Sequence, residues 1–238
     1  MSSFGYEGPD PTLRPDDRPP AGSGWLTKGR VENLADGVFS IVMTLLVLDL
    51  KVPELADRFT TEQSLWPSLV ALYPRYASYL IGFFTIGIYW VSHHYIFHFV
   101  RRMDRNALWL NIAFMCCLSF LPFSTAVMGR YPGNRSAVEV YGMTLLINSF
   151  ALLAIYGYSM GRRRLVDPNI TKGQVKEGAL RILFMPVTAL IGMFTAIWNP
   201  TAGAVIYLTA AGTYMLPEGM DLFRPRPKRK NKTPSEMY

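Results

Sequence analysis

Four uncharged stretches of membrane-spanning length constrain the fold more than any other feature of the chain. Asp, Glu, Lys and Arg are absent from Tyr76–Val100, Asn106–Gly129, Val140–Gly161 and Ile182–Pro217. A helix that crosses the hydrocarbon core of a bilayer needs about 20 predominantly apolar residues. Half of the 238 residues are hydrophobic and only 17% are charged, which argues against a soluble domain. We therefore predict an all-α membrane protein.

The last uncharged stretch is too long for one helix and predicts a helical hairpin. Ile182–Trp198 and Thr201–Pro217 flank the dipeptide Asn199-Pro200, which favours a turn. At about 1.5 Å per residue each segment rises about 26 Å, close to the thickness of the hydrocarbon core. A weaker candidate span, Arg30–Lys51, lies upstream and has only twelve uncharged residues before Asp49. The count of transmembrane helices is then six.

The Lys and Arg residues between the apolar stretches predict the orientation of the chain in the membrane. With six spans, one side collects most of them, including the loop with Arg101, Arg102 and Arg105 and the run Arg162–Arg164. The positive-inside rule places this side, together with both termini, in the cytoplasm of a multi-pass protein of the cell membrane. We interpret the net charge of +7 as this topology signal and expect no nucleic-acid partner.

The two ends of the chain differ in composition from the apolar centre. Residues 1–27 are rich in Pro, Gly and Asp and contain no apolar signal-peptide core, so we expect a disordered cytoplasmic N-terminus. Residues 28–220 would form the six-helix domain, and residues 221–238 a basic cytoplasmic tail. Six Lys or Arg residues lie between Arg224 and Lys232. We favour an orientation signal for this tail, and attraction to anionic lipid headgroups is the alternative.

The first span combines an apolar stripe with a carboxylate inside the membrane. On a helix of about 100° per residue, Leu34, Ile41, Leu45 and Leu48 share one face, and Asp36 lies about 140° from Ile41. The stripe admits two interpretations, a lipid-facing or bundle-core surface and the lining of a narrow hydrophobic pore, which periodicity does not separate. An intramembrane carboxylate is unfavourable unless it has a partner, so Asp36 should point into the bundle. Its candidate partners are Arg30, His93, His94 and a Trp N–H.

The first span also carries a recognisable motif. Arg30, three residues, Leu34-Ala35-Asp36 and then GVFSIVMTLLVLDLKVP resemble the first-helix signature of the transmembrane protein 175 family of potassium channels, in its bacterial six-helix form. The family pattern is Arg, three residues, Phe-Ser-Asp. Leu34 and Ala35 replace the Phe and Ser of this pattern, so any hydrogen bond that the family's serine makes is absent here. Further support for the resemblance comes from Tyr89-Trp90, His93-His94, Asp104, Asn111 and Leu121-Pro122-Phe123.

This resemblance implies a homotetramer in which the first helix of each subunit surrounds a central pore without the usual carbonyl filter. The sequence also contains no Thr-Val-Gly-Tyr-Gly segment. Carried over by position, Ile41 is the pore constriction, Leu45 and Leu48 form the next apolar rings, and Thr44 contributes to cation selectivity. A structural network would tie the pore helix to its bundle, and its members are Arg30, Asp36, Trp90, His93, His94 and Asn111.

The corresponding mechanism is a leak-type channel with a hydrophobic gate. Four closely packed isoleucines exclude water, and a small outward movement of the first helix admits a partly hydrated cation. We expect a preference for potassium over sodium that is weaker than in a carbonyl filter, with potassium as the permeant ion and no cofactor. Asp49 near the outer end would raise the local cation concentration, or would simply meet water or Lys51.

Three other functions compete with this hypothesis. A proton-coupled secondary transporter or a proton channel could use Asp36 and the histidines, although the spans show no evident internal repeat. A non-conducting scaffold is another alternative.

His94 and His98 share a helical face, but no third metal ligand accompanies them, so we expect no zinc site. No Gly-x-Ser-x-Gly or His-Glu-x-x-His motif occurs, and we expect no enzymatic activity.

Overall fold

The computed structural model describes residues 28–53, 62–162 and 165–215. The predicted N-terminal segment and the predicted basic tail lie outside these residues. The described elements are helices, apart from an isolated bridge between Val100 and Val166. In chain order they are α1 (Lys28–Leu45), the short 3₁₀ helix η2 (Leu46–Asp49), α2 (Glu62–Ala71), α3 (Tyr73–Phe99), α4 (Arg105–Ser119), α5 (Leu121–Arg130), α6 (Arg135–Gly161), α7 (Lys172–Ala196) and α8 (Pro200–Met215).

Five segments in the described part of the chain are long and apolar enough to cross a membrane. They are Lys28–Asp49, Tyr73–Phe99, Arg105–Arg130, Arg135–Gly161 and Lys172–Ala196. Each corresponds to a predicted span, so the all-α class and five of the six spans are confirmed by length and composition. The predicted sixth span coincides with α8, which has 16 described residues. Six spans therefore remain a prediction.

Local sequence signals explain where the helices start and stop. The predicted span Asn106–Gly129 is present but consists of two helices that meet at Phe120, because Pro122 has no N–H to donate within the helix.

α7 begins at Lys172 and not at the predicted Ile182. Thr171 and Gln174 form a capping box there, in which the Thr171 hydroxyl accepts a hydrogen bond from the Gln174 backbone N–H at 3.3 Å.

The predicted hairpin at Asn199-Pro200 is confirmed. α7 ends at Ala196 and α8 begins at Pro200. The side-chain oxygen of Asn199 accepts a hydrogen bond from the Ala202 N–H at 3.1 Å, which satisfies one of the free donors at the start of α8. Proline suits the first turn of a helix because its missing N–H would have no partner in the helix.

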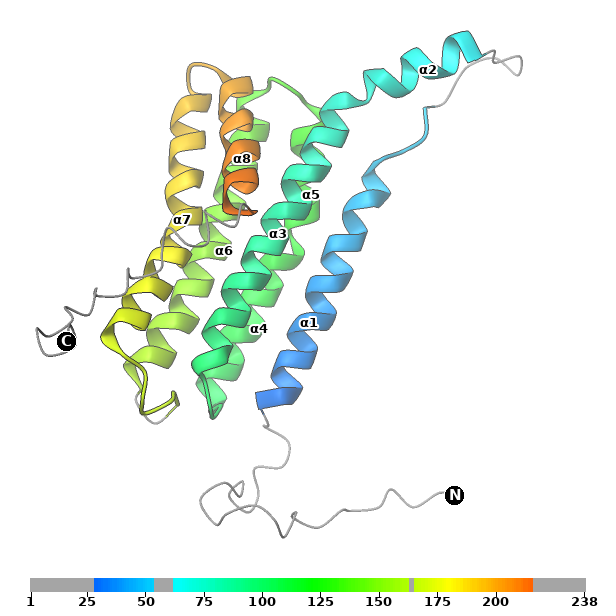
Figure 1. Cartoon of the computed structure of the whole chain (residues 1–238). Coiled ribbons are helices and arrows are strands. Elements are labelled where there is room, and N and C mark those ends of the chain that lie inside the picture. Colours follow the sequence, from blue (N-terminus) through cyan, green and yellow to red (C-terminus); the bar gives the residue numbers. More distant parts are fainter. Residues whose placement is uncertain (1–27, 54–61, 163–164, 216–238) are drawn as a thin grey trace, which may run out of the picture.

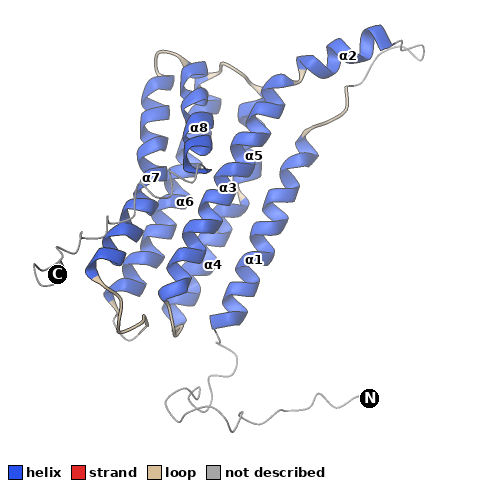
Figure 2. Cartoon of the chain, in the orientation of Figure 1, coloured by secondary structure: helices blue, strands red, loops and turns tan. Residues whose placement is uncertain are grey.

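The long helices run side by side, with α1 at one edge of the bundle and α7 near the other (Figure 1). α1 lies beside α3, and α2 leaves the bundle at the end where the α5–α6 and α7–α8 connections lie. Figure 2 shows that the loops joining successive spans lie at the two ends of the bundle. This distribution is expected of a membrane protein, because irregular backbone exposed to hydrocarbon leaves polar groups without partners.

Small residues let α6, α7 and α8 approach closely around one aromatic ring. Tyr207 on α8 is 2% exposed, and its ring and hydroxyl pack against the backbone at Gly142 and Gly192. The Tyr207 hydroxyl lies 3.5 Å from the carbonyl oxygens of Val138 and Ala189. Helices in membranes associate through close packing at such small residues, since water does not drive them together.

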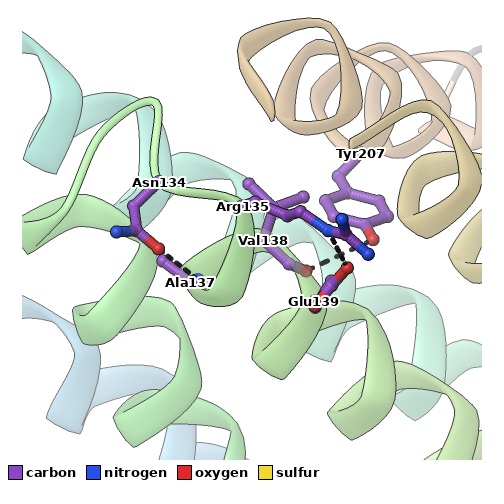
Figure 3. Close-up of polar contacts among 6 residues, drawn as sticks. All are labelled: Asn134, Arg135, Ala137, Val138, Glu139 and Tyr207. Carbon is purple, nitrogen blue, oxygen red and sulfur yellow. Dashed lines mark hydrogen bonds and ion pairs between the residues drawn. The ribbon is translucent and has the colours of Figure 1, made fainter. Parts of the chain in front are cut away.

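The end of α6 that lies near α8 is fixed by short-range polar contacts (Figure 3). The side-chain oxygen of Asn134 accepts a hydrogen bond from the Ala137 N–H at 3.2 Å and caps the helix. The next residue, Arg135, forms an ion pair with Glu139 one turn along the helix, at 2.5 Å between Nε and Oε1. Gly133, directly before Asn134, has a φ of 73°, a left-handed conformation that other residues rarely adopt.

The opposite end of the bundle is joined by contacts between the α3–α4 and α6–α7 connections. The backbone N–H of Arg101 donates to the Leu165 carbonyl at 2.8 Å, and the Arg101 guanidinium pairs with Asp167 at 2.5 Å. Backbone hydrogen bonding at Asn169 and the Arg101 guanidinium lower the pKa of the Asp167 carboxyl. A further bond, from the Tyr158 hydroxyl to Asp104 at 2.8 Å, ties α6 to the start of α4.

We predict that Gly192→Ala destabilises the protein. A methyl group at this position would overlap the ring of Tyr207, which is itself buried between the helices. Overpacking of this kind costs about 1–3 kcal/mol. Thermal unfolding of the purified protein in mild detergent should show a lower midpoint.

Gly157→Ala on α6 is the matched control. A methyl group there meets nothing within 4 Å, so the variant should be as stable as the wild type or more so, since alanine favours a helix over glycine by about 1 kcal/mol. Equal melting temperatures for the Gly192 variant and the wild type would contradict the packing described above.

Candidate functional site on α1 and α3

α1 presents one buried face to the bundle and leaves the opposite face open. The residues on its buried face are Val31, Ala35, Phe39, Val42 and, in η2, Leu46. The predicted apolar stripe lies on the open face, where Leu34, Ile41, Leu45 and Leu48 are 51%, 59%, 44% and 69% exposed. The stripe therefore does not form the core of a single subunit. In the membrane this stripe must face lipid, other subunits or the interior of a pore.

A line of polar groups runs along α1 beside this stripe, at intervals of four residues. The Ser40 hydroxyl donates to the Asp36 carbonyl at 2.8 Å. The Thr44 hydroxyl donates to the carbonyls of Ser40 at 3.1 Å and Ile41 at 2.9 Å. Because the proton of Thr44 is used within its own helix, the lone pairs of its oxygen are the groups left to face outward. An exposed Thr44 can thus act as an acceptor toward a cation.

Asp36 bonds to a tryptophan on the neighbouring helix. The Trp90 indole N–H donates to the Asp36 carboxylate at 2.9 Å and joins α3 to α1. The Trp N–H is one of the partners expected for Asp36, but both side chains are exposed in the single chain, so Asp36 lies at the surface of its own subunit and does not point into its interior. The physical reason is that the bond forms at the outer edge of the α1–α3 contact, where the indole covers only one side of the carboxylate. The His94 ring stacks on Trp90 at 5.7 Å between centroids.

His93 and Asn111 form a separate, buried pair between α3 and α4. The His93 Nε2 and the Asn111 side-chain oxygen lie 2.8 Å apart. The imidazole is 3% exposed and is surrounded by the rings of Phe39, Phe97 and Phe114. His93, one of the candidate partners of Asp36, thus pairs with the Asn111 amide and is enclosed by aromatic rings.

The two remaining charged residues of the predicted site lie apart from these pairs. Arg30, at the start of α1, is exposed and makes no hydrogen bond or ion pair with another described residue. Asp49 closes η2 at the other end of the span and lines a cavity of about 10 Å³, room for about one water, together with Arg75 and Tyr79. The predicted network is therefore divided: Trp90 holds Asp36, Asn111 holds His93, and Arg30 joins neither pair.

Sequence reasoning missed further polar contacts on the buried face of α3. The Tyr89 hydroxyl donates to the Leu145 carbonyl at 2.7 Å and lies 2.9 Å from the Ser149 hydroxyl. The Tyr141 hydroxyl donates to Thr85 at 2.9 Å. A signal was present, because Thr85, Tyr89 and His93 recur every four residues and so share one helical face. Their partners on α6 could not be found from the sequence.

No group of three or more His, Cys, Asp or Glu side chains in the described ranges is placed to hold a metal ion. His94 and His98 are both exposed on α3, and Trp90 precedes His94 by one turn. The described site consists of an open apolar stripe, an exposed hydroxyl and an aromatic–carboxylate hydrogen bond. Such groups can line a water-filled or dewetted passage.

Comparison with known proteins relates this arrangement to channels. The sequence model of a family described as "Endosomal/lysosomal potassium channel TMEM175" matches residues 30–122. A potassium channel of Streptomyces collinus is 33% identical over 211 residues, which are 87% of this chain and 98% of that protein. The human endosomal/lysosomal proton channel TMEM175 is 38% identical over 141 residues, which are 55% of this chain and 28% of the human protein.

The fold is similar to that of solved channel structures. The crystal structure of a lysosomal potassium-selective channel TMEM175 homolog from Chamaesiphon minutus has a TM-score of 0.67 at 28% identity. The match covers 79% of this chain and 95% of that one. The structure of a variant of the potassium channel MtTMEM175 has a TM-score of 0.51 at 16% identity and supports the fold alone.

We predict that Trp90→Phe weakens the attachment of α1 to α3. The substitution keeps an aromatic ring but removes the N–H that the Asp36 carboxylate accepts. Hydrogen bonds to charged groups contribute about 1.5–3 kcal/mol. The thermal unfolding midpoint in detergent should therefore fall.

Trp109→Phe on α4 is the control for this measurement. Trp109 is also exposed, and its indole N–H has no hydrogen-bond partner among the described residues. This variant should unfold close to the wild-type temperature. Equal losses of stability in the two variants would mean that ring size, and not the bond to Asp36, is responsible.

Proposed function

Because the chain belongs to the TMEM175 family, we propose that it forms a potassium-conducting, multi-pass membrane channel. Four subunits surround a central axis, each contributes six spans including α8, and the exposed face of α1 lines the pore. Support comes from the potassium channels among its relatives and from the fold shared with a potassium-selective homolog. The function is transport and not catalysis.

The open face of α1 is the observation that carries this proposal. The share of the span that is buried is 28% for α1 with η2, against 39–56% for the other four candidate spans. A helix at the centre of a ring must keep one face for its own bundle and leave the rest for the axis and the two neighbours. The distribution of buried and exposed residues on α1 fits that requirement, because its apolar stripe is continuous and its buried residues form one face only.

Ile41 would be the constriction of this pore. Four isoleucine side chains around an axis exclude water when they are close together, so the closed pore is dewetted. Leu45 and Leu48 form the next apolar rings toward the other end of the span. An outward displacement of α1 would widen all three rings and admit a partly hydrated cation.

Thr44 would supply the polar contribution to selectivity, one turn from the constriction. Its hydroxyl oxygen is an acceptor that can replace part of a potassium hydration shell. Asp49 would lie near the outer mouth. The Arg75 side chain lines the same small cavity, so we expect the attraction of Asp49 for cations to be weak.

We propose that both termini lie in the cytoplasm. Arg101, Arg105 and Arg162 belong to connections at the end of the bundle where α1 begins, which would be the cytoplasmic end by the positive-inside rule. The basic tail, outside the described residues, would reinforce this orientation or attract anionic lipids.

A proton channel or proton-coupled transporter is the second candidate, because the human relative is a proton channel. Asp36 and the exposed His94 would be its titratable groups. The bonding pattern favours the first candidate, since Asp36 is bound by Trp90 and His93 by Asn111, and no hydrogen bond links the two pairs.

The first test is potassium flux from proteoliposomes that contain wild-type protein or Ile41→Asn. An amide at the constriction holds water, so the variant should leak faster by at least about tenfold, and its preference over sodium and large organic cations should fall. Leu190→Asn on α7 is the control, because Leu190 is exposed to a similar degree, 56%, and does not lie on α1.

Potassium flux that is identical in the wild type and the Ile41 variant would exclude Ile41 as the constriction. Absence of potassium flux with proton flux present would instead favour the second candidate.

Thr44→Val tests the proposed role of the hydroxyl. The substitution preserves the branched shape of the side chain but removes its oxygen. We expect the potassium-to-sodium ratio, measured from reversal potentials in planar bilayers, to move toward one while the channel still conducts. A ratio equal to that of the wild type would mean that Thr44 does not contact the ion.

A further inference from the structure

An apolar groove between α3, α5 and α8 has no role in the proposed channel. Its volume is about 370 Å³, and α1 does not contribute to it. The residues of its floor are almost completely buried and include Ile81, Met128 and Val138. Its rim is exposed and includes Tyr73, Tyr131, Val205 and Leu208. The groove therefore opens at the surface of the bundle and reaches inward between the helices.

The polar character of the groove changes along its length. Tyr73, Tyr131 and Thr201 lie at one end, next to the α5–α6 and α7–α8 connections. At 1.5 Å per residue, Ile81 lies about 12 Å from Tyr73 along α3, and Leu208 lies about 10 Å from Thr201 along α8. Half of a hydrocarbon core of about 30 Å is about 15 Å, so the groove spans most of one leaflet.

Exposed aromatic residues place the membrane boundary at the tyrosine end of the groove. Trp66 on α2 and Trp198 in the α7–α8 turn are 71% and 69% exposed at the same end of the bundle (Figure 1). Trp and Tyr concentrate at the level of lipid headgroups, where one side of the ring is apolar and the other is wet. The groove thus begins at headgroup level and continues into the hydrocarbon.

The floor of the groove offers no free hydrogen-bond donor. Ser78 lies there, but its hydroxyl donates to the Arg75 carbonyl at 3.0 Å. The other floor side chains are Ile81, Met128 and Val138. A ligand that fills this space must therefore be apolar along its length and polar at one end only.

We propose that this groove binds an acyl chain of a phospholipid, with the headgroup beside Tyr73 and Tyr131. The bilayer supplies such chains with the required orientation, polar at the tyrosine end and apolar toward the membrane centre. A second copy of the chain is a poorer occupant, because the subunit contacts proposed above run through α1, which does not line the groove. The site depends on the membrane location of the helices and not on ion conduction.

The test uses vesicles of phosphatidylglycerol in which one acyl chain carries a photoactivatable diazirine. After irradiation of the reconstituted protein, labelled residues are identified by peptide mass spectrometry. We expect labelling of Ile81 and Val138, which are 3% and 1% exposed and out of reach of the lipids that simply surround the protein. Leu152 on α6, 1% exposed and outside the groove, should remain unlabelled.

In the variant Val205→Trp, the new side chain competes with the acyl chain for the groove. Val205 is half exposed on the rim, so an indole there can fill the groove without disturbing the core. Labelling of Ile81 and Val138 should fall by about tenfold, the ratio expected when binding is weakened by about 1.4 kcal/mol. Labelling of the exposed Leu190 should stay the same, and Leu190→Trp should leave the labelling of Ile81 and Val138 unchanged.

Two outcomes would overturn the proposal. Ile81 and Val138 could be labelled no more than Leu152, which would mean that the groove is closed or is filled by another subunit. Alternatively, labelling could be the same in Val205→Trp and the wild type, which would mean that the probe does not occupy the groove. Neither measurement depends on ion flux, so each result is independent of the channel proposal.

Discussion

The attachment of α1 to its own bundle along a single face is the constraint on which the rest of the arrangement depends. Val31, Ala35, Phe39, Val42 and Leu46 are buried against the neighbouring helices, and the opposite face remains open. These buried residues set the rotation of the helix about its axis and so decide that the stripe with Ile41 is left uncovered. The Trp90–Asp36 hydrogen bond joins α1 to α3 at the edge of this contact.

The polar groups of the spans are arranged in short pairs and not in a continuous chain. Tyr89 bonds to Leu145 and Ser149, Tyr141 to Thr85, and His93 to Asn111. Each pair satisfies groups that would be unfavourable alone in hydrocarbon. These pairs stabilise the contact of α3 with α4 and α6.

The sequence predicted the spans well because hydrocarbon imposes a length and a composition that can be counted. The Asn199-Pro200 turn could be found for the same reason, since a stretch of 36 uncharged residues is too long for one span. The helical wheel also separated the open stripe from Asp36 correctly. Periodicity gives the angle between residues on one helix but not the neighbour that each face meets. Asp36 was therefore expected inside the bundle, although it lies at the edge of a helix contact beside Trp90.

Contacts between helices depend on pairs of residues far apart in the chain, and the glycines show why these were not predictable. Gly192 and Gly142 matter because Tyr207 on α8 occupies the space that their missing side chains leave, whereas Gly157 meets no neighbour at all. In the sequence the three residues look alike. The same holds for the surface: Ile41 on α1 and Leu190 on α7 are equally apolar and equally open in one chain. What distinguishes them is the helix that carries them. α1 is held along one face by α3 and α4, whereas α7 is packed against both α6 and α8, and this difference in neighbours is not visible in the composition of either helix.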